Sequence, residues 1–282
     1  RFGDYASPQY GTIKSSENYE RRFIMTFPNE TLPKGRKQKT TALYDRFVNQ
    51  GAVMGDSFGL ENVLWFANNK EDAHEEPTIK RSRSHDYVSK EVINVRENVG
   101  LIEVANFSKH EFKGPDARKF LDHIMAGKLP KPGRISLSPM LSYRGKLCGD
   151  LTVACLDENE FMVFGSGAAQ EMHRRWFESH LGKFNLNYSN RSDEYHGLSI
   201  AGPNSRKVLE KIVRDDVSNK KFKFRDSRRM FVGGVPAIIN RISFTGELGY
   251  EIYVAPHYQL KLFEELMEAG KEFNINPFGG RA

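Results

Sequence analysis

The sequence has little cysteine and lacks any long apolar run. Its 282 residues include only Cys148 and Cys155, which are too few for a disulfide framework. These two cysteines stand seven positions apart and are expected to point to opposite faces of a strand, so we expect no bond between them. Neither has a neighbouring set of histidines or cysteines, so no metal site is expected, and free thiols favour a reducing compartment. No stretch is long enough to cross a bilayer as a helix.

The charge of the chain is nearly balanced, with 42 basic and 36 acidic residues and a net charge of +6. Part of the basic excess gathers at residues 34–39 and 219–229. The second segment interleaves phenylalanine with basic residues, a pattern that can bind single-stranded nucleic acid. Three acids, Asp215, Asp216 and Asp226, dilute it. We therefore expect a solvated face or a landing site for an anionic ligand, and no nucleic acid as a partner.

The order of expected elements indicates an α+β fold. Residues 1–86 have few periodic runs and are interpreted as a connecting segment that ends in a charged linker, whereas residues 87–282 alternate short strands and helices. Strands are expected at 100–105, 109–113, 142–156, 160–164 and 195–201, and helices at 116–124, 168–181, 205–213 and 258–273. Asp116 is the expected cap of the first helix. A fraction of 39% hydrophobic residues is enough for a packed core.

Two phrases of the sequence resemble each other. Lys113-Gly-Pro-Asp-Ala-Arg118 and Ala201-Gly-Pro-Asn-Ser-Arg206 both follow an expected strand and open an expected helix. They indicate either two related α/β units or a coincidence of helix-start chemistry, because proline is common in a first helical turn.

The segment from Arg241 to Glu251 carries two carboxylates around a glycine-bearing turn between strand-like runs. Glu247 and Glu251 are thus expected at or just past a hairpin turn. A carboxylate there can accept two parallel hydrogen bonds from an amidine-like edge, such as the N3–H and 2-amino group of a pterin. The alternative is an exposed hairpin whose acids serve solubility.

Two other segments contain residues that could carry chemistry. Asp150 heads an apolar strand, where an acid is disfavoured unless it has a partner or a role, although an acid at a surface edge is also common. Gly165-Ser-Gly167 follows a strand and precedes a helix as a dinucleotide loop would, but the third glycine is missing. We assign no dinucleotide to it.

Together with Gly145-Lys-Leu-Cys-Gly-Asp-Leu-Thr-Val153 and Leu198-Ser-Ile-Ala-Gly-Pro203, the Arg241–Glu251 segment resembles the folate-binding aminomethyltransferase family, the T-protein of glycine cleavage. The resemblance covers roughly residues 90–282. A looser likeness in Arg1-Phe-Gly, Ala42-Leu-Tyr-Asp-Arg46 and Glu61-Asn-Val-Leu-Trp-Phe66 is typical of the dimethylglycine and sarcosine dehydrogenase branch. The family resemblance implies the folate-binding aminomethyltransferase fold without the terminal β-barrel domain. The likeness to the dehydrogenase branch implies a preceding FAD domain outside this chain.

The resemblance also implies roles for single residues. Glu251 falls on the pterin-binding glutamate and Asp150 on the carboxylate near N10 of folate, where it would be the catalytic residue. Phe244 takes a place often filled by tyrosine, Glu247 belongs to the same motif and supports the turn, and Arg281 matches an arginine near the folate. Gly149 stands where many T-proteins have a second acid.

The function implied by this resemblance is that of an oxidoreductase acting on CH–NH donors. FAD would oxidise an N-methyl amine, and tetrahydrofolate held by this chain would capture the carbon as 5,10-methylenetetrahydrofolate. The alternatives are a free-standing glycine-cleavage aminomethyltransferase and a folate-binding module without turnover. The expected location is the cytoplasm, or the mitochondrial matrix of a eukaryote, with no membrane partner.

Overall fold

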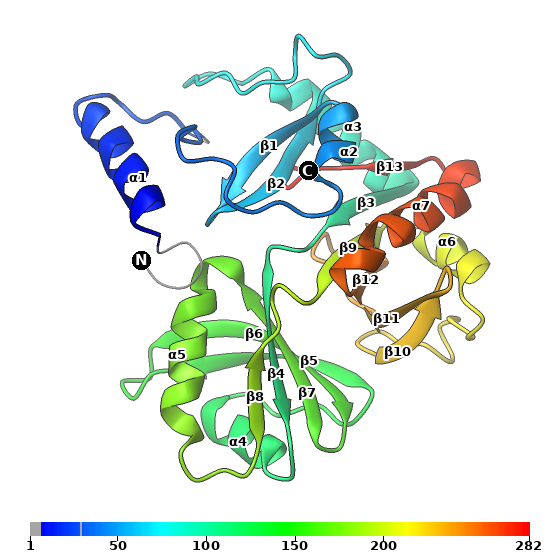
Figure 1. The fold of residues 1–282 in the computed structure, drawn as a ribbon. Helices are drawn as coiled ribbons and strands as arrows, with labels where there is room; N and C mark the ends of the chain where they lie inside the picture. The colour runs from blue at the N-terminus through cyan, green and yellow to red at the C-terminus, as the bar shows by residue number, and fades with distance from the viewer. Residues whose placement is uncertain (1–6, 29) are drawn as a thin grey trace.

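The strands of the protein form three sheets. The computed structural model describes residues 7–28 and 30–282, and within these ranges there are a two-stranded, a five-stranded and a six-stranded sheet. The five-stranded sheet lies at the bottom of Figure 1, the six-stranded sheet to its right, and the two-stranded sheet above. This mixed α/β architecture, with no closed barrel among the described residues, confirms the fold class expected from the sequence.

The six-stranded sheet has the order β10-β11-β12-β9-β3-β13 and is antiparallel except for the parallel pair β13 and β3. Helices α6 and α7 pack on one of its faces, where the largest hydrophobic cluster lies. The bounds are β3 Val99–Glu103, β9 His196–Ala201, α6 Ser205–Ile212, β10 Ser227–Val232, β11 Val235–Asn240, β12 Gly249–Val254, α7 Gln259–Gly270 and β13 Ile275–Pro277.

The five-stranded sheet is antiparallel, with the order β5-β6-β7-β4-β8. Its own cluster lies under α4 and α5 and is rich in phenylalanine. The bounds are β4 Phe107–Lys113, α4 Ala117–Ile124, β5 Arg134–Leu141, β6 Leu147–Asp157, β7 Glu160–Ser166, α5 Gln170–Leu181 and β8 Asn187–Asn190.

A third hydrophobic cluster lies between these two sheets. Ala154 of β6 and Phe164 of β7 meet Tyr253 of β12 there, and the rings of Phe164 and Tyr253 stack with centroids 4.5 Å apart. Because side chains alternate along a strand, the neighbours of these residues, such as Val153 and Ile252, turn into the helix-covered clusters instead. Each sheet therefore has one face on helices and one face toward the other sheet.

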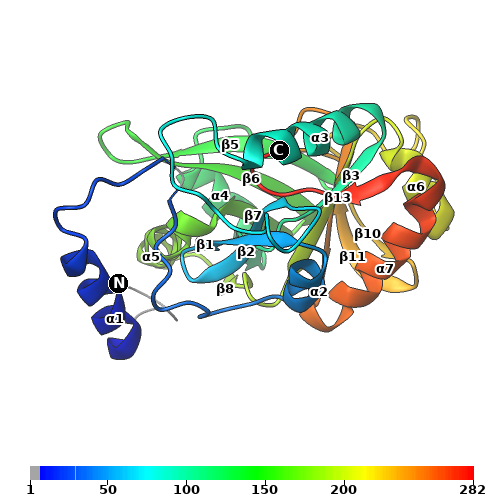
Figure 2. The same ribbon diagram turned by 90° about the horizontal axis from the view of Figure 1, so that it is seen from above.

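The core extends closer to the N-terminus than the predicted boundary at residue 87. Leu43 and Phe47 belong to the cluster of the six-stranded sheet, and Phe47 meets Phe263 of α7 edge to face with ring centroids 5.5 Å apart. The N-terminal elements are α1 Pro8–Glu20, α2 Tyr44–Asn49, β1 Ala52–Ser57, β2 Leu60–Phe66 and α3 Ser84–Glu97. Figure 2 shows α1 standing apart from the sheets, whereas β1, β2 and α2 lie against the body.

Two local predictions differ from the structure. The strand expected from residue 142 begins at Leu147, because residues 142–146 form the turn that joins it to β5, a strand that the sequence analysis missed. Asp116 occupies the N-cap position of α4 but makes no capping bond there. Its carboxylate instead accepts a hydrogen bond of 3.0 Å from the backbone of Asn185.

The two similar sequence phrases perform the same structural task. Gly114 follows β4 and Gly202 follows β9, with φ values of +141° and +127°, a region that favours glycine. A Cβ atom at Gly202 would lie 2.5 Å from the carbonyl oxygen of Val95, and one at Gly114 would lie 2.8 Å from the Cα of Leu186. The shared order of strand, glycine and short helix in both sheets supports two related units.

Among the described residues, none of the helices is long and apolar enough to span a membrane.

Candidate functional site

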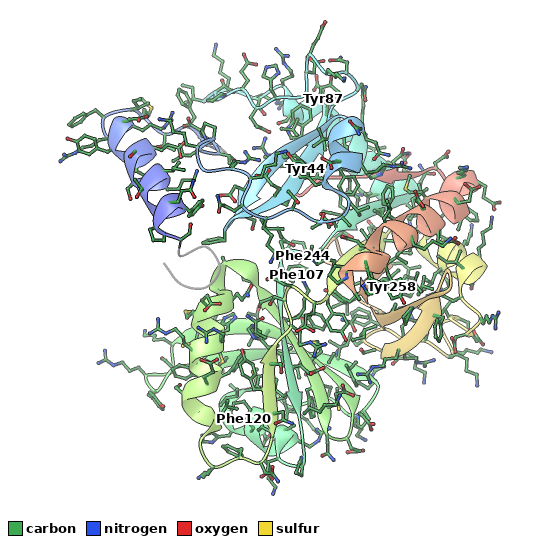
Figure 3. The ribbon with its side chains drawn as sticks, viewed as in Figure 1. Tyr44, Tyr87, Phe107, Phe120, Phe244 and Tyr258 are labelled. Atoms are coloured by element: carbon green, nitrogen blue, oxygen red, sulfur yellow. The ribbon has the colours of Figure 1, made fainter. Side chains whose placement is uncertain are left out.

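A cavity of about 810 Å³ lies between the two large sheets, and we call it the inter-sheet cavity. Its size is in the range of pockets that take a small organic ligand. Its walls are mostly apolar, with two carboxylates among them. Figure 3 labels two of its residues, Phe107 and Phe244, where the sheets meet. The lining residues are Ser57, Asn106, Phe107, Ile135, Leu137, Asp150, Thr152, Phe164, Gly165, Ser166, Gly167, Ala168, Phe224, Arg225, Ile242, Ser243, Phe244 and Glu251.

Glu251 is the buried acid of the inter-sheet cavity, with 7% of its surface exposed. It shares the face of β12 with Tyr253, whereas Tyr250 and Ile252 turn into the core under the helices. The hydroxyl of Tyr253 donates a hydrogen bond of 2.8 Å to Oε2 of Glu251. Burial raises the pKa of Glu251 to about 7, although this hydrogen bond and the cation of Lys109 oppose the rise. The carboxyl group can thus change its charge near neutral pH.

Asp150 is the exposed acid of the same cavity. It lies on β6 opposite Pro139 of β5 and shares a strand face with Thr152, which also lines the cavity. Its neighbour Leu151 points to the opposite side and is fully buried in the cluster under α5. The two predicted carboxylates, which are about a hundred positions apart in the chain, therefore meet at one cavity from different sheets.

Phe244 also lines the inter-sheet cavity, on the loop between β11 and β12, and 92% of its surface is exposed. An aromatic ring so open to solvent at a pocket mouth is free to stack on a flat ligand. Glu247, from the same loop, is not among the lining residues. The backbone N–H of Glu247 donates a hydrogen bond of 3.3 Å to Oγ1 of Thr245. The carbonyl oxygen of Glu247 accepts a hydrogen bond from the hydroxyl of Ser243.

Arg281 lies away from the other predicted site residues. It lines a separate cavity of about 470 Å³, together with Glu75 and Ser84. The Arg281 guanidinium forms an ion pair of 2.7 Å with Glu75. The structure thus brings together Asp150, Phe244 and Glu251 but not Arg281 or Glu247.

Several residues that line the inter-sheet cavity carry no motif from which a role could be predicted. Phe224 and Arg225 belong to the basic segment 219–229, for which an anionic ligand was one expectation. The side chain of Arg225 is exposed, and its Nε donates a bond of 2.9 Å to the carbonyl of Ile135. Asn106 and residues 165–168, at the end of β7 and just after it, complete the wall, so the glycine pair that resembles a dinucleotide loop does border a pocket.

Gly167 fits closely against this wall. A Cβ atom at this position would lie 2.1 Å from the carbonyl oxygen of Asn106, so only glycine allows the segment to pack there. Within the described ranges no group of three or more histidine, cysteine or acidic side chains could hold a metal ion, and both cysteines are free.

Residues 43–282 match the family described as the GCVT N-terminal domain. The chain is 34% identical to dimethylglycine dehydrogenase, mitochondrial, of Mus musculus over 99% of its own length and 32% of that protein. It is 32% identical to sarcosine oxidase subunit alpha of Rhizobium meliloti (strain 1021), over 86% of this chain and 24% of the relative. An aminomethyltransferase of Thermoanaerobacter pseudethanolicus is 30% identical over 66% of this chain and 50% of its own length.

A solved structure with a similar fold is the glycine cleavage system aminomethyltransferase T from Bartonella henselae. It has a TM-score of 0.70 and 22% identity, and the match covers 86% of this chain and 60% of that one. The chain spans about a third of the length of the mammalian dehydrogenases that it matches, 32% in the mouse protein.

Proposed function

Because the chain belongs to the family of the GCVT N-terminal domain, we propose that it binds tetrahydrofolate in the inter-sheet cavity and there captures a one-carbon unit. The observation that carries the proposal is the meeting of Asp150 and Glu251 at one mostly apolar cavity with an exposed aromatic ring at its mouth. The cavity volume suits a ligand of this size.

Glu251 grips the pterin in this proposal. When ionised, its carboxylate offers acceptors to the N3–H and 2-amino donors of the ligand, and two parallel charge-assisted bonds fix the orientation of the ring. Tyr253 already donates to Oε2 of Glu251, which holds the carboxylate in place before the ligand arrives. Phe244 stacks on the ligand from the outer side.

Asp150 handles the proton in this proposal. Tetrahydrofolate held here would supply N5 and N10 to take the place of the amine on the carbon of an iminium, and this exchange would release two protons, of which the departing amine takes up one. Asp150 accepts the other proton as a general base, and its exposed position lets it pass the proton to water. The departing amine keeps the electron pair of its broken bond to carbon.

We propose that this chain works together with an FAD domain. The substrate oxidised there would be an N-methyl amine of the dimethylglycine or sarcosine type. Two observations support this branch over a free-standing aminomethyltransferase. The match to mouse dimethylglycine dehydrogenase covers 99% of the chain at 34% identity, whereas the aminomethyltransferases of Thermoanaerobacter pseudethanolicus and Staphylococcus epidermidis cover 66% and 86% at 30% and 28%. In addition, Gly149 stands beside Asp150 where many aminomethyltransferases carry a second acid.

Calorimetric titration of the chain with tetrahydrofolate under anaerobic conditions tests the binding proposal. Glu251→Ala is expected to weaken binding by about 10-fold to 100-fold, because a charge-assisted bond contributes about 1.5–3 kcal/mol. Glu247→Ala is the matched control, since it removes an acid of the same loop motif that does not line the cavity. Equal binding by all three proteins, or no binding by the unaltered chain, would contradict the proposal.

A further inference from the structure

Lys109 is a fully buried cation between the two large sheets. It belongs to β4 of the five-stranded sheet and lies opposite Phe164 of β7, so both residues point toward the six-stranded sheet. Its ammonium group donates a hydrogen bond of 2.8 Å to the carbonyl oxygen of Ala105. A single backbone acceptor does not offset the cost of burying an ammonium ion, so anionic neighbours are needed.

Two acids act on this cation, the half-buried Glu103 and the buried Glu251. Glu103 ends β3 and accepts hydrogen bonds from Gln259 and Thr41, whereas Glu251 lies on β12 at the inter-sheet cavity. Both carboxylates act electrostatically on Lys109. The ammonium also lies 5.9 Å from the centroid of the Tyr253 ring, whose hydroxyl bonds Glu251.

We propose that Lys109 is a positioning residue that keeps the Glu251 carboxylate charged for pterin binding. The inference rests on the function proposed above and assigns a role to a residue outside the cavity, because Lys109 is not among the lining residues. The Lys109 ammonium acts on the Glu251 carboxylate by electrostatic attraction through space. It also contacts the ring of Tyr253, whose hydroxyl donates the hydrogen bond that orients Glu251.

The charges around this pair set the sign of the effect. Burial raises the pKa of Glu251 to about 7 and lowers that of Lys109 to about 7, and each ion favours the charged form of the other. The other titratable groups are Glu103, which supports the Lys109 charge, and Lys39, which opposes it. His196 on β9 bonds Gln259 through Nδ1 at 3.0 Å, and burial lowers the pKa of the His196 ring so that it stays neutral.

Removing the Lys109 charge is therefore expected to raise the pKa of Glu251 further. Folate binding requires the ionised carboxylate, so affinity in the unaltered chain falls as the pH drops through about 7. In Lys109→Met the same fall is expected at a pH higher by about one unit, the smallest effect typical of an opposite charge close by. A role in packing alone would weaken binding equally at every pH.

The experiment is a calorimetric titration with tetrahydrofolate from about pH 6 to about pH 9, a range that spans both sides of the expected midpoint. Lys109→Met and Lys109→Gln are compared with Lys113→Met, which removes the same charge from the exposed end of the same strand. We expect the midpoint to rise in both Lys109 variants and to stay unchanged in the control. Lys109→Gln retains a donor for the Ala105 carbonyl and isolates the effect of the charge.

A ligand-free measurement covers the case in which the Lys109 variants fold poorly. In a double-mutant cycle of thermal unfolding, Lys109→Met is expected to destabilise the protein less when Glu251→Gln is already present, because the uncompensated acid is gone. Additive effects together with an unshifted binding midpoint would overturn the role of Lys109 while leaving folate binding intact. A chain that binds no folate at any pH would overturn the proposed function and this inference with it.

Discussion

Tyr253 donates a hydrogen bond to Glu251 two residues earlier on the same strand, and both side chains face the space between the sheets. The pair combines a buried carboxylate with a fully buried ring, so the acid at the cavity is held by the scaffold. Glu251, the binding group of the proposed function, is consequently also a cost to the folded state.

Glu251→Gln is expected to stabilise the free protein above neutral pH. The folded-state pKa of about 7 lies above the ordinary value of 4.5, so the favourable effect of protonation is complete below about pH 4.5 and lost as the pH rises through 7. Glutamine avoids this loss and still accepts the Tyr253 bond, and Glu103 remains as an anionic neighbour of Lys109. Unfolding by urea at about pH 8 should show a gain of roughly 1–3 kcal/mol, which disappears near pH 4.5.

Asp150→Asn is expected to separate binding from turnover. The amide has the shape of the carboxylate but cannot take up a proton, so one-carbon transfer should fall by about 100-fold or more. Folate affinity should stay within about threefold of the unaltered chain. Asp150 is exposed, so replacing its carboxylate by an amide leaves no buried polar group without a partner. Product formation would be measured with an N-methyl amine in a protein that joins this chain to the proposed FAD domain. Unchanged turnover would leave a binding role alone.

Phe244→Ala is expected to weaken folate binding without changing stability. The ring is 92% exposed, so its loss removes no core packing, whereas stacking on a flat ligand contributes about 0.5–1.5 kcal/mol. Titration should show a loss of about two- to tenfold with an unchanged melting temperature. Phe231→Ala is the control, as this exposed phenylalanine of β10 is not a lining residue. If the two variants bind equally well, Phe244 has no part in the site.

Gly149→Ala is expected to destabilise the protein through His173. A Cβ atom at residue 149 would lie 2.8 Å from Nε2 of His173, a buried residue of α5. Overpacking of this kind costs about 1–3 kcal/mol. Gly149→Ala should destabilise the protein less when it is introduced into His173→Ala, because the His173 ring that would clash with the new Cβ atom is then absent. Gly145→Ala, with nothing within 4 Å of its Cβ, reports the cost of a positive φ alone.

The sequence predicted those parts of the fold in which local patterns and tertiary contacts agree. The helices after Gly114 and Gly202 begin at Ala117 and Ser205, close to the expected residues, because a glycine with positive φ and a proline restrict the chain locally. The hairpin that carries Glu251 is also present, with β11 and β12 paired as expected. The burial of Leu43 and Phe47 in the core could not be predicted, because it depends on contacts with residues far along the chain that no local pattern encodes.

The candidate site could be predicted from the sequence only in part, because it also depends on contacts between distant segments. Asp150, Phe244 and Glu251 lie in recognisable motifs, but their convergence depends on how two sheets pack. Phe224 and Arg225 reach the cavity because residue 225 has a φ of +67° and its backbone pairs with Ile135, a geometry without a sequence signature. Lys109 reads as one more alternating strand lysine, and only the fold reveals it as a buried cation.

Strand β12 meets two demands at alternate positions. Glu251 and Tyr253 face the space between the two large sheets, where Glu251 lines the cavity, and the even-numbered residues fill the core under α7. A deletion or insertion of one residue within the strand would exchange these sets and place a carboxylate among aliphatic side chains. The loop of residues 241–248 carries no such restriction on its length. Divergence of ligand preference among proteins of this family is therefore expected to proceed through that loop, with the length of β12 held constant.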